Sequence, residues 1–524
     1  MSAACFLRFF SFYQGPRVLS PAGYAVFLEK AENFAKDFYE GQKAMLKTFI
    51  KSLVFRFAGE SSFFAIQLVT MVILSRILTP SDFGVVAVVM IVYNFLNAFN
   101  DAGFKNIVIQ RLDSNVANFK KIYGTSIALG AFLCMLMFML APLASIVFKD
   151  DRIGVASSVT SITFIFLSAS KITSAILEKE FKFGLVSLVI TLSALFSGVI
   201  AIIMAYLGAG YWSLIFMFIV KSLIDVIAFS FFSRLWLPIF DLSFMRSFFK
   251  FGTYITFYNL MYYVSQSVEK FLIGRCDGTA SLGYYTRSYT LLNVYERLFP
   301  SIVVQVLYPV LGKIKNDKEA ISKVYYSALE VMFLVGGILM AIVGAWSEEF
   351  TSIIWGRQWG ESALSLSILS FSAIAFTQIV LTRMVFISFY AENKLMHFSL
   401  FISVLTTVLC LIGAYWGTTQ IVVGYCAAAW IASVVLGMYV GIYLAPGTVG
   451  RFFLIMGKSL FAVLIFSSFA CALKYYLIGY LEINIYVSLL MALMLLLPML
   501  FAFLFVFERG HILKLKECVH GSGR

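Results

Sequence analysis

Several long apolar stretches of this chain contain polar side chains that could do chemistry. In the stretch 246–274, Tyr254, Tyr258, Tyr262 and Glu269 fall within an arc of about 80° if the segment is helical. Tyrosine rings can stack on sugar rings while their hydroxyl groups form hydrogen bonds. This stripe is therefore a candidate sugar-contacting wall that ends in a carboxylate, although packing between helices would produce the same pattern.

Four cations also lie within or near the middle of apolar stretches: Lys171, Arg287, Arg297 and Arg383. An unpaired cation that faces hydrocarbon costs several kcal/mol, so these side chains are expected to face a protein interior. A guanidinium group offers a fixed fork of donors that matches a phosphate. The four residues are therefore candidates for holding an anionic ligand inside the protein.

A second set of charged residues lies nearer the ends of the apolar stretches and ranks lower. It comprises Arg56, Glu60, Asp101, Lys221 and Asp225. Two pairs in this set are spaced i,i+4 and could form ion pairs within one helix, and snorkelling explains the positions equally well.

The acidic pair Asp150-Asp151 resembles the paired carboxylates of membrane glycosyltransferases. It stands within the charge-balanced turn Lys149–Arg152, which favours a solvated loop.

The composition defines the class of protein that must position these residues. The 524 residues are 61% hydrophobic and 13% charged, with a mean hydropathy of +0.91. Soluble domains are about 25% charged, so the chain is neither soluble and globular nor disordered. Its three histidines and seven cysteines, with no CxxC spacing, predict no metal site and no disulfide framework. The net charge of +13 fits lysine-rich and arginine-rich cytoplasmic loops rather than nucleic-acid binding.

The apolar stretches do not alternate in the manner of a β-barrel, and each is long enough for a membrane-spanning helix. We therefore predict an all-α, polytopic membrane protein with about fourteen transmembrane helices. The predicted spans are 52–77, 82–104, 122–148, 155–176, 183–207, 211–233, 246–274, 281–309, 322–346, 361–390, 394–416, 419–444, 453–478 and 484–507.

The charges between these spans predict an orientation. Lysine and arginine are more frequent in the loops on the same side as the N-terminus, which places both termini in the cytoplasm. Residues 1–45 lack a span-length apolar run, and we expect a poorly ordered, dispensable extension that would also fit a translation start at Met45.

An internal repeat connects the two halves of the chain. Ser75-Arg76 precedes Asp82-Phe83-Gly84-Val85, and Gly274-Arg275 precedes Ser281-Leu282-Gly283-Tyr284. Arg76 and Arg275 are 199 positions apart, as are Gly84 and Gly283. Six spans separate the copies, and this even number predicts a parallel repeat about an axis along the membrane normal.

These segments resemble those of a known family. The resemblance lies in Leu74–Gly84, Phe99–Phe104, Ile109–Arg111, Ile273–Arg275, Leu282–Tyr285 with Arg287, and Tyr308–Leu311. The chain resembles polysaccharide-type flippases of the multidrug, oligosaccharidyl-lipid and polysaccharide exporter superfamily over residues 46–510. One departure is Glu269, followed by Lys270, where the family often has Asp.

The resemblance implies a fold of two six-helix lobes plus two C-terminal helices. It places the N-terminal extension at 1–45, the first lobe at 46–235, the second lobe at 236–445, spans 13 and 14 at 446–510 and a basic cytoplasmic tail at 511–524. It also implies a transporter rather than an enzyme, in the bacterial inner membrane, that flips a polyprenyl-diphosphate-linked oligosaccharide for O-antigen or exopolysaccharide synthesis by alternating access.

The expected partners are this lipid-linked substrate, membrane lipid and other polysaccharide-assembly membrane proteins. No cofactor is expected, and coupling to a proton or sodium gradient is left open. Two alternatives remain at this point. One is a multidrug or metabolite exporter of the same superfamily, and the other is a membrane sugar polymerase or glycosyltransferase.

Overall fold

The computed structural model describes two long parts of the chain. They are residues 59–241, except 101–107 and 109–115, and residues 260–498, except 262, 301–302, 305–306, 308–310, 312–317, 389–391, 445–447, 482–483, 485, 493 and 497. Every regular element within these ranges is helical, which confirms the predicted all-α class.

The helices of the first half are Gly59–Ile77, α3 (Pro80–Asn100), α5 (Val116–Phe148), α6 (Asp151–Thr160), α7 (Thr163–Lys179), α8 (Phe183–Tyr206) and α9 (Trp212–Ser233). The helices of the second half are α11 (Val268–Cys276), α12 (Gly278–Leu298), α14 (Lys318–Ala345), α15 (Ser347–Ile354), α16 (Ser362–Phe371), α17 (Ala373–Ser388), α18 (Glu392–Gly413) and α19 (Thr418–Tyr439). They are followed by α20 (Val449–Lys474) and the short π-helical segment Tyr475–Tyr480.

Among the described residues, ten helices are long and apolar enough to cross a membrane. The pair Ser362–Phe371 and Ala373–Phe386, bent by 50°, would make an eleventh. The predicted count of fourteen stays a prediction, because parts of several predicted spans lie outside the described ranges.

The outward surface of α5 shows why this is a membrane protein. Its most exposed large side chains are all apolar: Phe132, Met135, Phe138, Met139, Leu143 and Ile146. A soluble protein rarely exposes a contiguous apolar face of this kind. Serines such as Ser126 and Ser168 lie buried between α5 and α7, where the Ser126 hydroxyl donates to the Ser168 carbonyl over 2.8 Å. Small residues allow such helices to approach closely within a bilayer.

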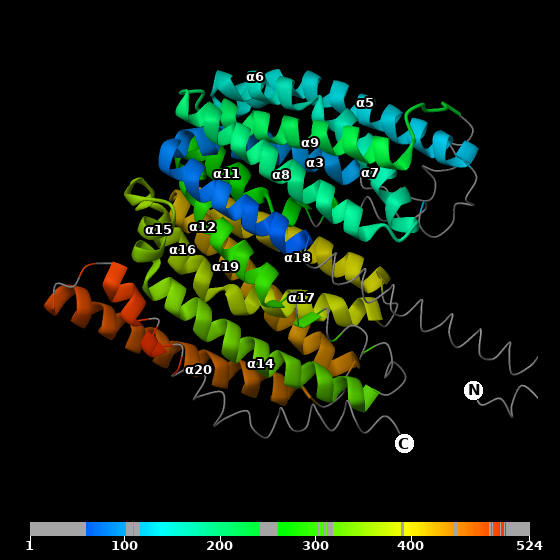
Figure 1. Cartoon of the computed structure of the whole chain (residues 1–524). Coiled ribbons are helices and arrows are strands. Elements are labelled where there is room, and N and C mark those ends of the chain that lie inside the picture. The colour runs from blue at the N-terminus through cyan, green and yellow to red at the C-terminus, as the bar shows by residue number, and fades with distance from the viewer. Residues whose placement is uncertain are drawn as a thin grey trace, which may run out of the picture.

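Figure 1 shows the two halves as separate layers, with α5–α9 in the upper part and α14–α20 in the lower part. Within the first half, α7 packs on α5 and α9, and α8 packs on α9. Within the second half, α17 packs on α14 and α19, and α20 covers α14. The most extensive contact between the halves is that of α3 with α12.

Two interior features differ from the uninterrupted spans expected from the sequence. The predicted seventh span is broken at Gln266 and Ser267, which form a turn before α11 begins. The predicted tenth span is bent at Ser372 between α16 and α17. Broken helices at membrane depth are tolerated where they line a cavity or are buried in protein.

Candidate functional site

The two halves meet most closely where α3 and α12 begin, and we call this the hairpin end. A Cβ atom on Gly84 would lie 1.7 Å from the Thr279 carbonyl oxygen, and one on Gly283 would lie 1.9 Å from the Pro80 carbonyl oxygen. Pro80 and Thr279 are 199 positions apart, as are the two glycines. Such reciprocal contacts are those expected across a two-fold axis, and they place the axis of the predicted repeat between α3 and α12.

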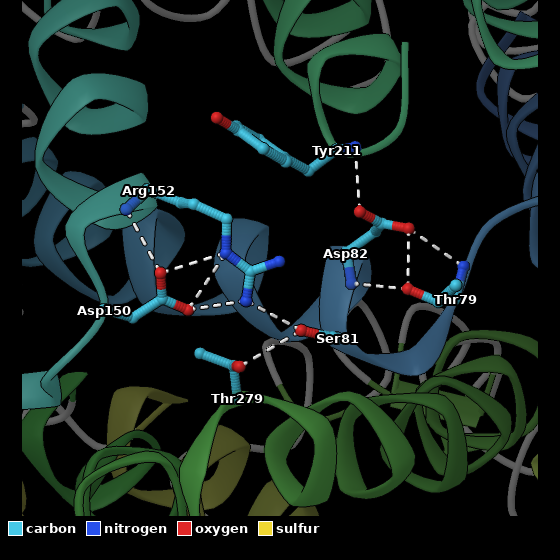
Figure 2. Close-up of polar contacts among 7 residues, drawn as sticks. All are labelled: Thr79, Ser81, Asp82, Asp150, Arg152, Tyr211 and Thr279. Atoms are coloured by element: carbon cyan, nitrogen blue, oxygen red, sulfur yellow. Dashed lines mark hydrogen bonds and ion pairs between the residues drawn. The ribbon is translucent and has the colours of Figure 1, made fainter. Parts of the chain in front are cut away.

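A polar network joins the helix starts at this end (Figure 2). Arg152 donates from Nε to Asp150 Oδ1 over 3.0 Å and from Nη2 to Asp150 Oδ2 over 2.7 Å. The same Nη2 donates to Ser81 Oγ over 2.8 Å, and Ser81 Oγ lies 3.3 Å from Thr279 Oγ1 across the boundary between the halves. The Arg152 guanidinium holds the pKa of Asp150 below its usual value of 3.8. Asp150 is thus a structural N-cap of α6, and its part in this network was not predicted from the sequence.

Asp82 fixes the start of α3 through a second set of hydrogen bonds beside this network (Figure 2). Its Oδ2 accepts hydrogen bonds from the Thr79 N–H over 3.0 Å and from Thr79 Oγ1 over 2.7 Å. Its Oδ1 accepts from the backbone N–H of Tyr211, one residue before α9, over 3.1 Å. A carboxylate near a helix N-terminus is stabilised by the unpaired N–H groups there. Asp82 therefore ties α3 to α9 and holds the first hairpin in place.

A loop of the second half also covers the end of the first helix. The indole Nε1 of Trp359 donates to the Ser75 carbonyl over 2.8 Å, and Gln358 donates to the same carbonyl. Arg76 in turn donates from Nη2 to the Ile353 carbonyl over 2.7 Å. The last carbonyl groups of a helix have no partner within it, so the second half supplies the partner here. The hairpin end is closed by these bonds together with the α3–α12 contact.

Behind this closed end lies a cavity of about 460 Å³ between the halves. Its walls come from the first helix, α3, α9, α12 and the segment that leads into α11. The polar side chains in its lining are Asn94, Tyr263, Gln266, Ser267, Lys270, Thr286, Arg287, Tyr289, Thr290 and Asn293. Two of them are cations, and the described lining contains no carboxylate.

Arg287 is the most unusual residue of this cavity. It is 8% exposed, and its guanidinium carbon lies 4.3 Å from the centre of the Phe83 ring and 5.2 Å from that of Trp355. Its Nε and Nη1 have no hydrogen-bond partner among the described residues. Aromatic faces attract a cation but accept no strong hydrogen bond. A buried guanidinium with free donors is costly unless an anion joins it.

Lys270 and Glu269 form an ion pair at the start of α11. The Lys270 Nζ lies 2.7 Å from Glu269 Oε1 and 4.0 Å from the centre of the Tyr289 ring. The Glu269 side chain is fully buried, and its Oε2 has no hydrogen-bond partner in the described structure. The break at Gln266 and Ser267 is what places this pair at a helix start beside the cavity. The opposite charges of Glu269 and Lys270 therefore stabilise each other, as their adjacency in the sequence suggested.

A network of tyrosines surrounds Gln266. The hydroxyl groups of Tyr289 and Tyr425 each donate to Gln266 Oε1 over 2.9 Å. Tyr263 reaches from the second half to the first, and its hydroxyl donates to the Ile91 carbonyl over 2.8 Å. Sequence reasoning missed these residues, because a tyrosine in an apolar stretch looks the same whether it packs in a core or lines a cavity.

The other predicted cations do not line this cavity. Lys171 donates to Asn97 over 3.3 Å within the first half. Arg297 is exposed and lies over the Phe64 ring at 5.4 Å. Arg383 lines a separate cavity of about 80 Å³ in the second half, together with Glu296. Of the predicted cations, only Arg287 lines the central cavity, and Glu269 reaches its edge through the ion pair with Lys270.

The lower-ranked candidates are arranged as follows. Lys221 and Asp225 form an i,i+4 ion pair of 2.6 Å on α9, which is the helical pairing that their spacing predicts. Glu60 is exposed near the start of the first helix. Five further candidates lie outside the described residues: Arg56, Asp101, Tyr254, Tyr258 and Tyr262. A search of the described part of the chain finds no group of three metal-ligating side chains.

Residues 73–364 match the sequence profile of the family described as polysaccharide biosynthesis protein. The match covers more than half of the chain. The chain belongs to this family. The matched region contains the closed hairpin end, the cavity, Glu269 and Arg287.

Individual relatives from bacteria support this assignment. The chain is 25% identical over 319 residues to an uncharacterized membrane protein in the cps region of Klebsiella pneumoniae, covering 60% of this chain and 65% of that protein. It is 22% identical over 305 residues to the lipopolysaccharide biosynthesis protein WzxC of Escherichia coli (strain K12), covering 58% and 62%. It is 24% identical over 335 residues to the succinoglycan biosynthesis transport protein ExoT of Rhizobium meliloti (strain 1021), covering 62% and 66%. Each match thus spans slightly less than two thirds of the relative's length.

Solved structures share the fold. The lipid II flippase MurJ in an inward closed conformation superposes with a TM-score of 0.70 at 16% identity, over 88% of this chain and 100% of that chain. An inward-facing multidrug resistance transporter of the MATE family superposes with a TM-score of 0.59 at 12% identity, over 72% and 94%. The chain therefore shares the polytopic, all-helical fold of these two proteins.

Proposed function

We propose that this protein moves a polyprenyl-diphosphate-linked oligosaccharide across the bacterial inner membrane by alternating access. The observation that carries the proposal is Arg287, whose Nε and Nη1 have no partner among the described residues and which lines a cavity together with Lys270. A diphosphate would supply the acceptor oxygens and the negative charge that these groups require. Arg287 and Lys270 would bind the diphosphate, and no residue would need to act as a catalyst.

The remaining polar lining suits a glycan. Asn94 and Asn293 offer amide groups, and Thr286 and Thr290 offer hydroxyl groups. Sugar hydroxyl groups both donate and accept hydrogen bonds, so amide side chains pair with them in either direction. The names of two relatives, a lipopolysaccharide biosynthesis protein and a succinoglycan biosynthesis transport protein, support the same class of substrate.

The sign of the cavity charge argues against the export of cationic drugs. Lys270 and Arg287 are both in its lining, and Glu269 pairs with Lys270, whereas Arg287 has no ion pair with a carboxylate of the described residues. A cationic drug would therefore meet the uncompensated charge of Arg287 in a poorly screened interior. Export of an uncharged or anionic drug remains as the second candidate, and the experiment below distinguishes it.

The proposed orientation places both termini in the cytoplasm and the hairpin end toward the outside. In that orientation the structure represents a state that is closed to the outside. Membrane lipid and other membrane proteins of polysaccharide assembly would be the partners, and a proton or sodium gradient would drive transport without a bound cofactor. Separation of the halves at the α3–α12 contact would open the outer side.

The test is a chromosomal deletion in the source bacterium that is complemented with variants. The deletion should abolish surface polysaccharide and leave lipid-linked oligosaccharide in the cytoplasmic leaflet. Wild type should restore both readouts, and Arg287→Ala should not. The matched control is Arg451→Ala, an exposed arginine on α20 outside the cavity, with protein levels compared by immunoblot. Normal polysaccharide in the deletion strain together with increased drug sensitivity would instead indicate a drug exporter.

A further inference from the structure

An apolar groove of about 350 Å³ runs between α3, α5 and α11. Among its lining residues are Phe95 on α3, Leu143 and Phe148 on α5, and Phe271 on α11. Phe95, Leu143 and Phe271 are 37%, 53% and 39% exposed, so the groove opens to the surface of the protein. Because α3 and α5 belong to the first half and α11 to the second, the groove lies where the two halves meet on the flank that would face lipid.

The groove continues into the central cavity. Ile91, Tyr263 and Ser267 line both spaces. The Tyr263 side chain forms the partition, because its hydroxyl donates to the Ile91 carbonyl over 2.8 Å and its ring lies 6.5 Å from that of Phe95. This hydrogen bond joins the second half to the first. Rotation of one side chain would therefore connect an apolar channel with a polar, cationic chamber.

The groove and the cations also lie at similar depths. Lys270 stands six residues before the end of α11 and Arg287 nine residues after the start of α12, about 9 and 13 Å along each helix from the hairpin end. On α5 the groove extends from Leu140 to Phe148, the last residue of the helix, about 12 Å along the axis. A phosphate between the cations and a hydrocarbon chain in the groove would thus be at the same level.

We propose that the groove holds the isoprenoid chain of the lipid-linked substrate while its diphosphate occupies the cavity beside Lys270 and Arg287. Tyr263 acts as the gate through which the link between chain and phosphate passes. The inference rests on the proposed function and adds a chain-binding site to it. An isoprenoid is favoured as the occupant because it is a single, methyl-branched chain, and the groove offers one slot bordered by the rings of Phe95, Phe148 and Phe271. Two of these rings, Phe148 and Phe271, pack edge to face at 5.2 Å.

Photolabelling of the full-length protein in lipid nanodiscs tests this directly. The probe is a polyisoprenyl diphosphate without sugar that carries a diazirine in its chain. In the wild type it should label the peptides that contain Ile91–Phe95 and Leu140–Phe148. Leu143→Trp fills the groove and should reduce that labelling at least about tenfold, which corresponds to 1.4 kcal/mol of binding free energy. Met139→Trp is the matched control, because Met139 is 65% exposed on the same helix, against 53% for Leu143, and does not line the groove.

The possible outcomes separate this inference from the proposed function. Labelling of the cavity peptide Thr286–Asn293 on α12, none of whose residues lines the groove, without labelling of Leu140–Phe148 would overturn the groove assignment and leave the proposed function intact. No labelling of either region would count against both. A phosphatidylglycerol that carries a diazirine is the lipid control. If it labels the groove equally well, and Leu143→Trp reduces this labelling to the same extent, the groove is a site for ordinary membrane lipid and the proposal is overturned. The wild-type labelling map remains decisive even if Leu143→Trp inserts poorly.

Discussion

The most specific residue-scale test concerns the guanidinium of Arg287. Arg287→Lys keeps the positive charge and removes the fork of donors that a diphosphate can accept from. Hydrogen bonds to charged groups contribute about 1.5–3 kcal/mol, so transport should fall by about tenfold or more. Arg287→Ala should reduce it further. Surface polysaccharide per unit of inserted protein measures the effect, and Arg451→Lys serves as the control. Normal transport by Arg287→Lys would show that charge alone suffices.

Glu269 has two roles that mutation can separate. If its carboxylate takes part in proton coupling, Glu269→Gln should abolish transport at unchanged protein level. If it only balances Lys270, to which it is paired at 2.7 Å, the double variant Glu269→Gln with Lys270→Gln should restore transport. Leaving one member of a buried pair alone is expected to cost about 3–5 kcal/mol, so thermal stability should be measured on all three proteins. Wild-type transport by Glu269→Gln alone would exclude both roles.

Residue type predicted part of this site and missed the rest for a physical reason. Arg287 and Glu269 could be identified because charge within an apolar stretch is costly and needs a reason. Tyr263 and Gln266 could not, because their roles depend on a break in a helix that hydropathy alone does not reveal. Lys171, Arg297 and Arg383 avoid the cost of a charge facing hydrocarbon in other ways. Lys171 donates to the Asn97 amide, Arg297 lies over the Phe64 ring, and Arg383 lines a second cavity.

At the scale of elements, the glycines of the α3–α12 contact give the next prediction. Gly84→Ala or Gly283→Ala places a methyl group against backbone of the other half, and overpacking costs about 1–3 kcal/mol. The closed hairpin end should therefore become less populated, by about tenfold. Disulfide formation between cysteines replacing Ser81 and Thr279, measured in a background without the native cysteines, reports this population. Gly457→Ala on α20 is the control, because nothing lies within 4 Å of its added Cβ; an equal loss of cross-linking there would refute the steric explanation.

The Asp150–Arg152 pair should make the same closed end sensitive to acid. Arg152 lowers the pKa of Asp150, so the stabilisation is fully present above the usual value of 3.8 and is lost as the pH falls through the lower value of the folded protein. In detergent-solubilised protein with native Ser81 and Thr279, protection of the hairpin-end amides from hydrogen exchange, corrected for the intrinsic exchange rate at each pH, should therefore decline below about pH 4. Asp150→Asn should give lower protection that no longer depends on pH over that range. Identical acid profiles for the two proteins would assign the effect to other groups.

Helix positions were largely predictable, and helix interruptions were not. The predicted span 183–207 corresponds to α8 at Phe183–Tyr206, and 211–233 corresponds to α9 at Trp212–Ser233. Hydrophobic length determines both, because an exposed backbone has no partner in lipid. The separate helix α15 and the 50° bend before α17 were missed. Those features depend on tertiary contacts, such as the loop after α15 that caps the first helix, which local sequence does not record.

At the scale of the whole molecule, the internal repeat is visible both in the sequence and in the contacts of the structure. The 199-residue offset recurs in the reciprocal contacts of Gly84 with Thr279 and of Gly283 with Pro80. A two-fold arrangement lets two similar halves rock about one contact, which is how transporters with parallel repeats alternate access. The domain boundaries at 235 and 445 stay predictions, and the N-terminal extension 1–45 lies outside the described residues.

The proposed alternating access makes one further demand on the molecule, which is that the hairpin end must open in every transport cycle. Ser81 Oγ and Thr279 Oγ1 lie 3.3 Å apart across the halves, so cysteines at these positions can reach disulfide distance. In a background without native cysteines, oxidation of Ser81→Cys with Thr279→Cys should stop transport, and a reducing agent should restore it. Ser81→Cys alone should be unaffected by either treatment. A locked protein that still transports at the wild-type rate would mean that substrate does not leave past the α3–α12 contact, and the site of opening would have to be sought elsewhere between the halves.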